Sequence, residues 1–166
     1  MTFEEYQNEA VKFRCETANS TTYLILRLIE EVGEAAGKLA KYYRDGVFDE
    51  KAFIKELGDI LWVVANLADY YKSDCIQQAC KLNFKQVENT YYQDVSDIKA
   101  LAVFTSRLAA DSAKDPVNFA CVISCLVVIA KSFDYTIEQV AEINLAKLRD
   151  RAARGVIKGN GDGDER

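Results

Sequence analysis

The sequence predicts an all-α protein built as a helical bundle, and three observations support this. Apolar residues recur every three or four positions through most of the chain, no segment alternates at a period of two, and the 166 residues include only eight Gly and one Pro. The length allows one domain with a real core. We expect this domain to span residues 1–157, and the Gly-rich, polar residues 158–166 to form a disordered tail.

Composition narrows the setting and the partners. The net charge of -5 and the pI near 4.9 argue against nucleic-acid binding. No apolar run is long enough to cross a membrane and no signal-peptide pattern is present, so we expect a cytoplasmic protein with no membrane partner. Five irregularly spaced Cys residues and the absence of His argue against a zinc site and favour reduced, core cysteines.

The N-terminal part of the chain predicts two helices. Thr2 and Glu5 form a capping box, from which a first helix is expected to run toward Ala18. The polar stretch 19–22 then caps a long helix that ends around Tyr43.

Two glycines, Gly33 and Gly37, lie inside that long helix, where each costs about 1 kcal/mol relative to Ala. Close approach of another helix, for example from a second subunit, would explain them. Simple tolerance is the alternative.

A second central helix follows a turn at Asp45 and Gly46. Asp49 caps this helix, which continues to Tyr71. Residues 74–115 are then expected to form an insertion of two helices, roughly 74–93 and 96–114. They could add an interface, a lid over the site, or further bundle core.

The last two helices have clear start signals. Asp115 is an N-cap and Pro116 the first residue of an apolar helix that runs to Phe133 and is expected to be fully buried. Thr136 begins the final helix, where Gln139 completes a capping box.

The two central helices each carry a pair of carboxylates three residues apart. On a helical wheel Glu56 falls at the centre of an apolar arc and Asp59 at its edge, while Glu31 borders the arc of the first helix and Glu34 lies further out. Packing the two apolar stripes together would bring these acids to one rim. Two carboxylates about 4 Å apart repel by roughly 4 kcal/mol at an effective dielectric of 20, so the group must take up protons or bind a cation. Oxygen ligands favour Mg²⁺, with Mn²⁺ possible. The alternative is a set of solvated surface acids.

Basic residues complete the candidate site. In the final helix Asn144 lies in the apolar stripe, and Lys147 and Arg151 share the border of that face. The amide needs a hydrogen bond and the cations need an anion, and phosphate oxygens would satisfy both. Lys38 lies on the same side as Glu34 and would touch phosphate or pair with an acid. The alternative for these residues is surface cations beside a structural amide.

Three sequence blocks together resemble the MazG-like superfamily of all-α nucleoside triphosphate pyrophosphohydrolases. The first two are the paired acidic motif and the third is similar to the Asn-x-x-Lys-Leu helix of that family. The blocks are Glu30-Glu31-Val32-Gly33-Glu34, Glu56-Leu57-Gly58-Asp59-Ile60-Leu61-Trp62, and the segment from Val140 to Arg151 that contains Asn144-Leu145-Ala146-Lys147-Leu148. The similarity covers residues 2–71 and 117–151.

The resemblance implies a bundle that assembles as a homodimer or homotetramer and hydrolyses a nucleoside triphosphate between its α- and β-phosphates, giving the monophosphate and pyrophosphate. Four acids would hold Mg²⁺ and three side chains would bind phosphate or sugar: Glu31, Glu34, Glu56 and Asp59, and Asn144, Lys147 and Arg151. Because the chain has no His, a carboxylate must serve as the base, and Glu30 is our hypothesis. Asn66 and Trp62 are candidates to contact the nucleobase, although packing is the simpler role for Trp62.

Three other interpretations stay open. One is a dUTP or dCTP diphosphatase on the same scaffold, and another is a non-catalytic helical scaffold that binds no Mg²⁺. A di-iron carboxylate bundle is the third, but such sites normally use Glu-x-x-His pairs, which this chain lacks.

Overall fold

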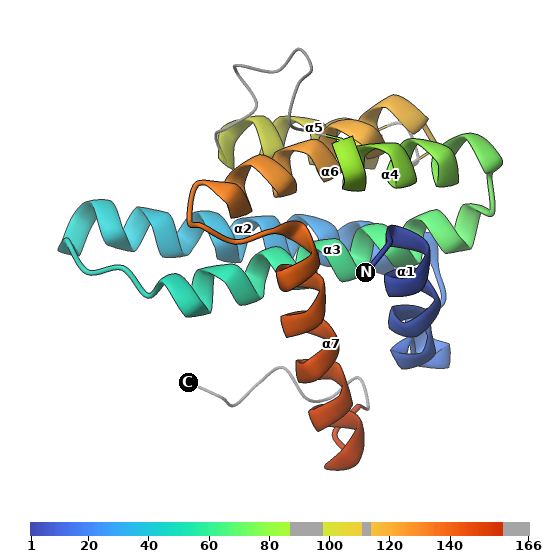
Figure 1. Ribbon diagram of the computed structural model, residues 1–166, viewed down its shortest axis with the longest axis horizontal. Coiled ribbons are helices and arrows are strands. Elements are labelled where there is room, and N and C mark those ends of the chain that lie inside the picture. Colours follow the sequence, from blue (N-terminus) through green and yellow to red (C-terminus); the bar gives the residue numbers. More distant parts are fainter. Residues whose placement is uncertain (87–97, 111–113, 158–166) are drawn as a thin grey trace.

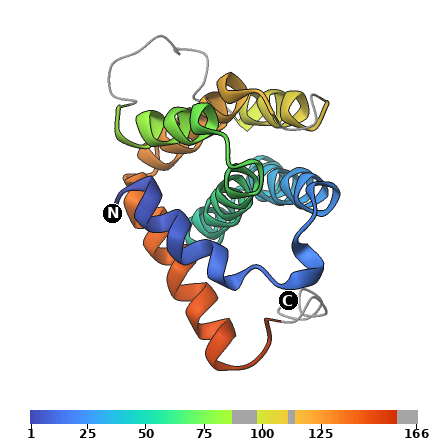
Figure 2. The same ribbon diagram turned by 90° about the vertical axis from the view of Figure 1, so that its right-hand side faces the viewer.

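The computed structural model describes residues 1–86, 98–110 and 114–157. Over these ranges the chain is all-α, as predicted, with no strand. Two long antiparallel helices lie side by side at the middle of the molecule between two further groups of helices (Figures 1 and 2). The central pair is α2 (Thr21–Asp45) and α3 (Glu50–Tyr71); on one side lie α4 (Asp74–Gln86), α5 (Ile98–Ala110) and α6 (Pro116–Lys131), and on the other α1 (Phe3–Ala10) and α7 (Ile137–Ala153).

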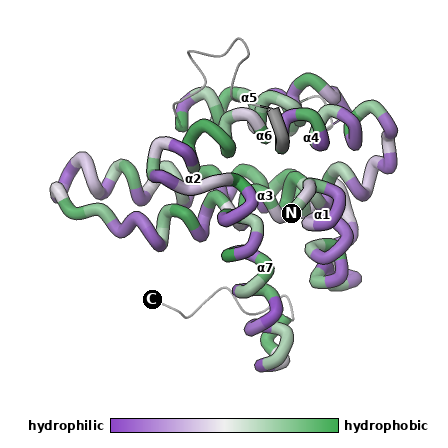
Figure 3. The backbone as a smooth tube through the Cα atoms, in the orientation of Figure 1, coloured by the Kyte–Doolittle hydropathy of each residue, from purple (hydrophilic) through white to green (hydrophobic). Residues whose placement is uncertain are grey.

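Helix α3 is the most enclosed element because it packs against α1, α2, α4, α6 and α7. Apolar side chains point outward from it in several directions and are almost fully buried, among them Phe53, Leu57, Ile60, Val64 and Leu67. Helices α2 and α7 alternate between hydrophobic and hydrophilic residues instead (Figure 3). They therefore each bury one face and leave the other in water.

Caps fix the hairpin that joins the central helices. The Ser20 side chain accepts from the Tyr23 N–H at 3.2 Å at the start of α2, and Gly46, with φ of +72°, ends it in the left-handed conformation. Asp49 then accepts from the Ala52 N–H at 2.9 Å and starts α3. These predicted signals are confirmed, and the short connection holds the two acidic motifs on adjacent, antiparallel helices.

The predicted extent of the first helix was wrong. Helix α1 ends at Ala10 and is followed by two 3-10 turns, Val11–Phe13 and Glu16–Ala18. The Ala10 carbonyl accepts from the indole N–H of Trp62 at 3.1 Å, and Arg14 is extended so that its guanidinium lies 2.7 Å from Asp69. These side-chain contacts to α3 favour a chain reversal over continuation of the helix.

The described parts of the predicted insertion contribute to the core. Helices α4 and α5 both pack on α6, and their buried apolar side chains join the main cluster: Ile76, Cys80, Phe84, Leu101 and Leu108. Lys114, the predicted end of the second inserted helix, is not helical. The other predicted helix ends, at residues 93 and 96, and the predicted disordered tail 158–166 lie outside the described residues.

Helix α6 begins as predicted, with Asp115 accepting from the Val117 N–H at 2.9 Å and Pro116 in its first turn. It is buried along most of its length, but Val117 is exposed because it lies in the first turn, and the helix ends at Lys131, short of Phe133. None of the described helices is both long and apolar enough to span a membrane.

Candidate active site

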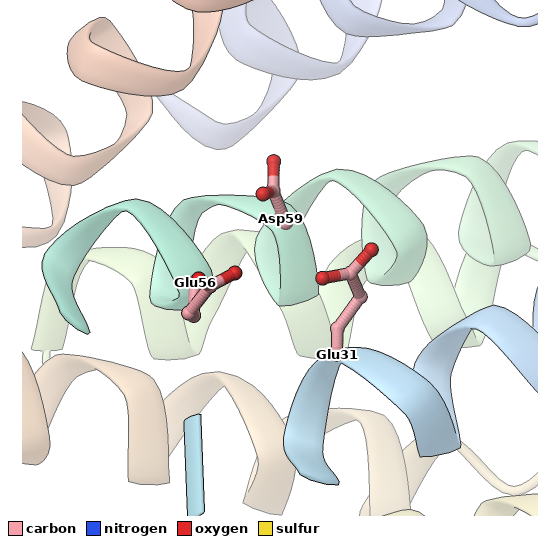
Figure 4. A group of neighbouring side chains, drawn as sticks. All are labelled: Glu31, Glu56 and Asp59. Carbon is pink, nitrogen blue, oxygen red and sulfur yellow. The ribbon is translucent and has the colours of Figure 1, made fainter. Parts of the chain in front are cut away.

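Three carboxylates from the central hairpin converge. Glu31 extends from α2 toward α3, where Glu56 and Asp59 lie one turn apart (Figure 4). One oxygen of each carboxylate lies within 4.8 Å of the others. The Asp45–Gly46 turn and the antiparallel packing of α2 on α3 thus bring together acids that are 28 residues apart in sequence, counted from Glu31 to Asp59.

Glu31 is the most buried member of this acid cluster, with 2% of its surface exposed. Burial raises the pKa of Glu31 to about 8, and the neighbouring Asp59, Glu34 and Glu56 carboxylates add to the rise, while Arg27 opposes it. Burial also raises the pKa of Asp59, against the opposing effect of Lys147. The site therefore favours either a bound proton or a further cation beside these oxygens.

Each acid of the cluster has its own basic partner. Arg27 donates to Glu31, the Lys38 ammonium lies 3.0 Å from a Glu56 oxygen, and Lys147 donates to Asp59. The three cations come from α2 and α7, and all are at most partly exposed. Each carboxylate of the acid cluster therefore lies beside a basic side chain.

A buried hydrogen-bond chain reaches the cluster from the far ends of the sequence. The Asn144 amide nitrogen donates to Asp59 Oδ1 at 3.1 Å, and the Tyr6 hydroxyl donates to Asn144 Oδ1 at 2.8 Å. Tyr6 and Asn144 are almost fully buried, and burial raises the pKa of Tyr6, with Asp59 adding to the effect. Asn144 thus has protein partners at both ends of its amide.

Residues 19–91 match the family of MazG nucleotide pyrophosphohydrolase domains. This match supports assigning the chain to the MazG-like superfamily. The matched region contains both acidic pairs and extends through α4, and it supports hydrolase activity on a nucleotide. Neither the curated proteins nor the solved structures provide a match to this chain.

The acid cluster of this MazG-like chain fits a hard divalent cation. Its donors are carboxylate oxygens, the ligand type that Mg²⁺ prefers, and one oxygen from each of the three residues lies within 4.8 Å of the others. A divalent cation would also supply the positive charge that the raised pKa of Glu31 calls for. Glu31, Glu56 and Asp59 are the residues that could hold it.

Two other predicted acids lie at the edge of the site. Glu34 is exposed and is not one of the three residues that converge, although its charge contributes to the raised pKa of Glu31. Glu30 is about half exposed and accepts from Arg27 at 2.8 Å. Arg27 therefore links Glu30 to Glu31.

The wheel prediction for the two buried glutamates was wrong in its order. It placed Glu56 at the centre of the apolar face and Glu31 at a border, whereas Glu31 is buried and the Glu56 side chain is 12% exposed. Glu31 follows Leu28 by three residues on the side of α2 that faces its neighbours, and Lys38 draws Glu56 toward the rim.

The remaining predicted side chains lie around the cluster. Arg151 is partly buried, and its charge opposes the rise that burial causes in the pKa of Asp59. Asn66 is fully buried and donates to the Trp62 carbonyl at 2.8 Å, while its Oδ1 has no partner among the described residues. The Trp62 indole N–H is bonded to Ala10, which accords with a packing role.

Arg27 and Tyr6 were missed as site residues by sequence reasoning. Arg27 precedes Glu31 by four positions, a spacing at which opposite charges pair on a helix. Tyr6 lies in the apolar stripe of α1, where its hydroxyl needs a buried partner. The sequence contains both the Arg27–Glu31 spacing and the apolar position of Tyr6, but neither identifies the side chain to which the residue bonds.

Proposed function

We propose that this MazG-like protein is a Mg²⁺-dependent pyrophosphohydrolase that cleaves the α–β phosphate bond of (d)NTPs to give the nucleoside monophosphate and pyrophosphate. The observation that carries the proposal is the convergence of Glu31, Glu56 and Asp59 within the matched MazG region. The chain has no His, and we propose the acids and their basic partners as the reactive groups.

Four acids are proposed to hold the metal: the three of the cluster together with Glu34, which lies close enough to affect the pKa of Glu31. When bound, Mg²⁺ or Mn²⁺ would neutralise the phosphate oxygens and the charge that develops on the leaving pyrophosphate.

The basic residues are proposed to bind the triphosphate. Lys38 and Lys147 are held beside Glu56 and Asp59, so their ammonium groups are positioned before substrate arrives. Arg151 lies near enough to Asp59 to oppose the rise in its pKa and is the third proposed phosphate ligand. Such charge-assisted hydrogen bonds to phosphate are among the stronger polar contacts in proteins.

Glu30 is proposed as the general base that takes a proton from the attacking water. It is exposed to solvent, adjacent to Glu31 in sequence, and oriented by its 2.8 Å hydrogen bond from Arg27. A base must lie within reach of the water and outside the ligand set, and the position of Glu30 next to Glu31 supports it as the candidate.

Asn66 is proposed to contact the nucleobase. Asn66 is fully buried, so a base could reach it only by displacing the side chains that cover it; its Oδ1 accepts no hydrogen bond within the described residues, and an N–H donor of the base would then satisfy it. A contact from Asn66 does not select one base, so a dUTP or dCTP diphosphatase on the same scaffold stays the alternative proposal. Asn144, predicted to contact sugar or phosphate, is bonded to protein groups at both ends, and we return to it below.

We also propose a homodimer or homotetramer in a reducing, cytoplasmic setting. A methyl group added at Gly33 or Gly37 would meet no atom within 4 Å, so no described helix of this chain crowds these glycines. Close approach of a second copy would explain them, with simple tolerance as the alternative. Cys75, Cys80 and Cys125 are free thiols, which supports the reducing setting.

The proposal is tested by incubating the purified protein with Mg²⁺ and a panel of NTPs and dNTPs, and separating products by anion exchange. We expect monophosphate and pyrophosphate from the wild-type protein and from a Glu142→Gln control, which changes an exposed acid of α7. Glu56→Gln is expected to be inactive. Release of orthophosphate would contradict α–β cleavage, and equal behaviour of all three proteins without any product would favour a non-catalytic scaffold.

A further inference from the structure

The hydrogen-bond chain from Tyr6 through Asn144 to Asp59 joins three helices that are distant in sequence. Tyr6 lies on α1, Asn144 on α7 and Asp59 on α3, and the two bonds measure 2.8 and 3.1 Å. Tyr6 is 0% exposed and Asn144 is 1% exposed. Neither side chain is placed to touch a dissolved substrate directly, so any effect on hydrolysis must pass through Asp59.

The direction of this chain is determined by Asp59. An ionised carboxylate only accepts hydrogen bonds, so Asn144 must turn its nitrogen toward Asp59, and its oxygen then faces Tyr6. The Tyr6 hydroxyl must therefore donate. Without that donor, the buried Asn144 oxygen loses its partner, and flipping the amide would set oxygen against oxygen at Asp59.

Gly58 allows the two helices to come this close. A Cβ atom at Gly58 would lie 3.0 Å from the Asn144 Cβ, tighter than most Cβ contacts in proteins, so Asn144 would have to shift by a few tenths of an ångström. Gly58 immediately precedes Asp59 inside α3, where a Gly costs about 1 kcal/mol relative to Ala. The missing side chain permits Asn144 of α7 to reach the carboxylate beside it.

We propose that Tyr6 and Gly58 are positioning residues that act through Asn144 to fix the Asp59 carboxylate for a divalent cation. This inference rests on the proposed function. Asp59 is held at both oxygens, since Asn144 donates to Oδ1 and Lys147 to Oδ2. Partners of this kind orient metal-binding carboxylates and contribute to metal affinity without contacting the metal.

The first test measures Mn²⁺ binding to the full-length protein without nucleotide, by electron paramagnetic resonance of free Mn²⁺. Tyr6→Phe keeps the ring and removes only the hydroxyl, and we expect roughly tenfold weaker binding. Tyr135→Phe is the matched control because Tyr135 is a partly buried tyrosine in the loop before α7, and its hydroxyl is not part of this hydrogen-bond chain. It should bind Mn²⁺ like the wild type.

Steady-state hydrolysis gives the second readout. For Tyr6→Phe the Mg²⁺ concentration for half-maximal rate should rise by a similar factor, and excess Mg²⁺ should restore the rate. A purely structural role of the hydroxyl would lower the folded fraction and would leave the metal affinity of folded molecules unchanged.

Gly58→Ala provides an independent variant, with Glu142→Gln as its control because Glu142 is an exposed acid of α7 that takes no part in the hydrogen-bond chain. We expect weaker Mn²⁺ binding only for Gly58→Ala. If both Tyr6→Phe and Gly58→Ala bind Mn²⁺ with wild-type affinity, this inference is overturned and the proposed function stands. If neither variant folds, the two residues stabilise the fold, and the inference is overturned in that case too. No Mn²⁺ binding by the wild-type protein would overturn the proposed function as well.

Discussion

Replacing Glu31 with Gln measures how much the ionised Glu31 side chain destabilises the metal-free protein. The substitution keeps the size of the side chain and removes its charge. In the metal-free protein the pKa of Glu31 is about 8, against 4.5 for an ordinary glutamate, chiefly because the side chain is buried. At a pH between these two pKa values, Glu31 holds a proton in the folded state and has released it in the unfolded state.

The sign of the pH effect follows directly. Raising the pH through this window favours unfolding of the wild-type protein, because the unfolded state binds fewer protons there. One pKa unit corresponds to about 1.4 kcal/mol. From about pH 6 to pH 8 the free energy of unfolding of the wild type should therefore fall by about 2 kcal/mol relative to Glu31→Gln, with the change flattening near the folded-state pKa.

Urea unfolding in EDTA at several pH values measures this difference. Glu31→Gln should become progressively more stable than the wild type as the pH rises, while saturating Mg²⁺ should stabilise the wild type and have little effect on the variant. A difference in unfolding free energy between the two proteins that does not change with pH would refute the reasoning. So would a wild type that becomes more stable relative to Glu31→Gln as the pH rises.

Three further predictions follow from the same structure. Asp59→Asn should reduce pyrophosphate release by more than the roughly 100-fold that outer partners of a metal site can cause, measured as kcat/KM at fixed Mg²⁺. Lys38→Gln should raise the KM for nucleotide by about tenfold, since a charge-assisted hydrogen bond contributes at least about 1.5 kcal/mol, and an unchanged KM would remove Lys38 from the phosphate site. Phe53 is fully buried against Phe48 and Phe133. Phe53→Ala should therefore lower the free energy of unfolding by about 3–5 kcal/mol, measured in urea.

The fold was largely predictable because its signals are local. Caps at Asp49, Asp115 and Thr136 lie next to the apolar periodicity that they start, and each is confirmed. The end of α1 was not predictable in this way. It depends on contacts from Trp62 and Arg14 that exist only after α1 has packed on α3.

The site was predictable in its residue types more than in its connections. Acid pairs on adjacent helices indicated a cluster, and three of the four acids converge. The burial of Glu31 depends on how α2 is enclosed by neighbours, which a helical wheel does not contain. The bond from Tyr6 to Asn144 spans 138 residues, so no sequence spacing could have shown it.

The most direct test of the central claim is phosphorus NMR of a nucleoside triphosphate during incubation with Mg²⁺ and the wild-type protein. We predict that the triphosphate signals are replaced by those of the monophosphate and pyrophosphate, and that chelating the metal stops the change. Appearance of the diphosphate with orthophosphate, or turnover that continues in EDTA, would contradict a metal site at Glu31, Glu56 and Asp59 that acts on the α–β bond.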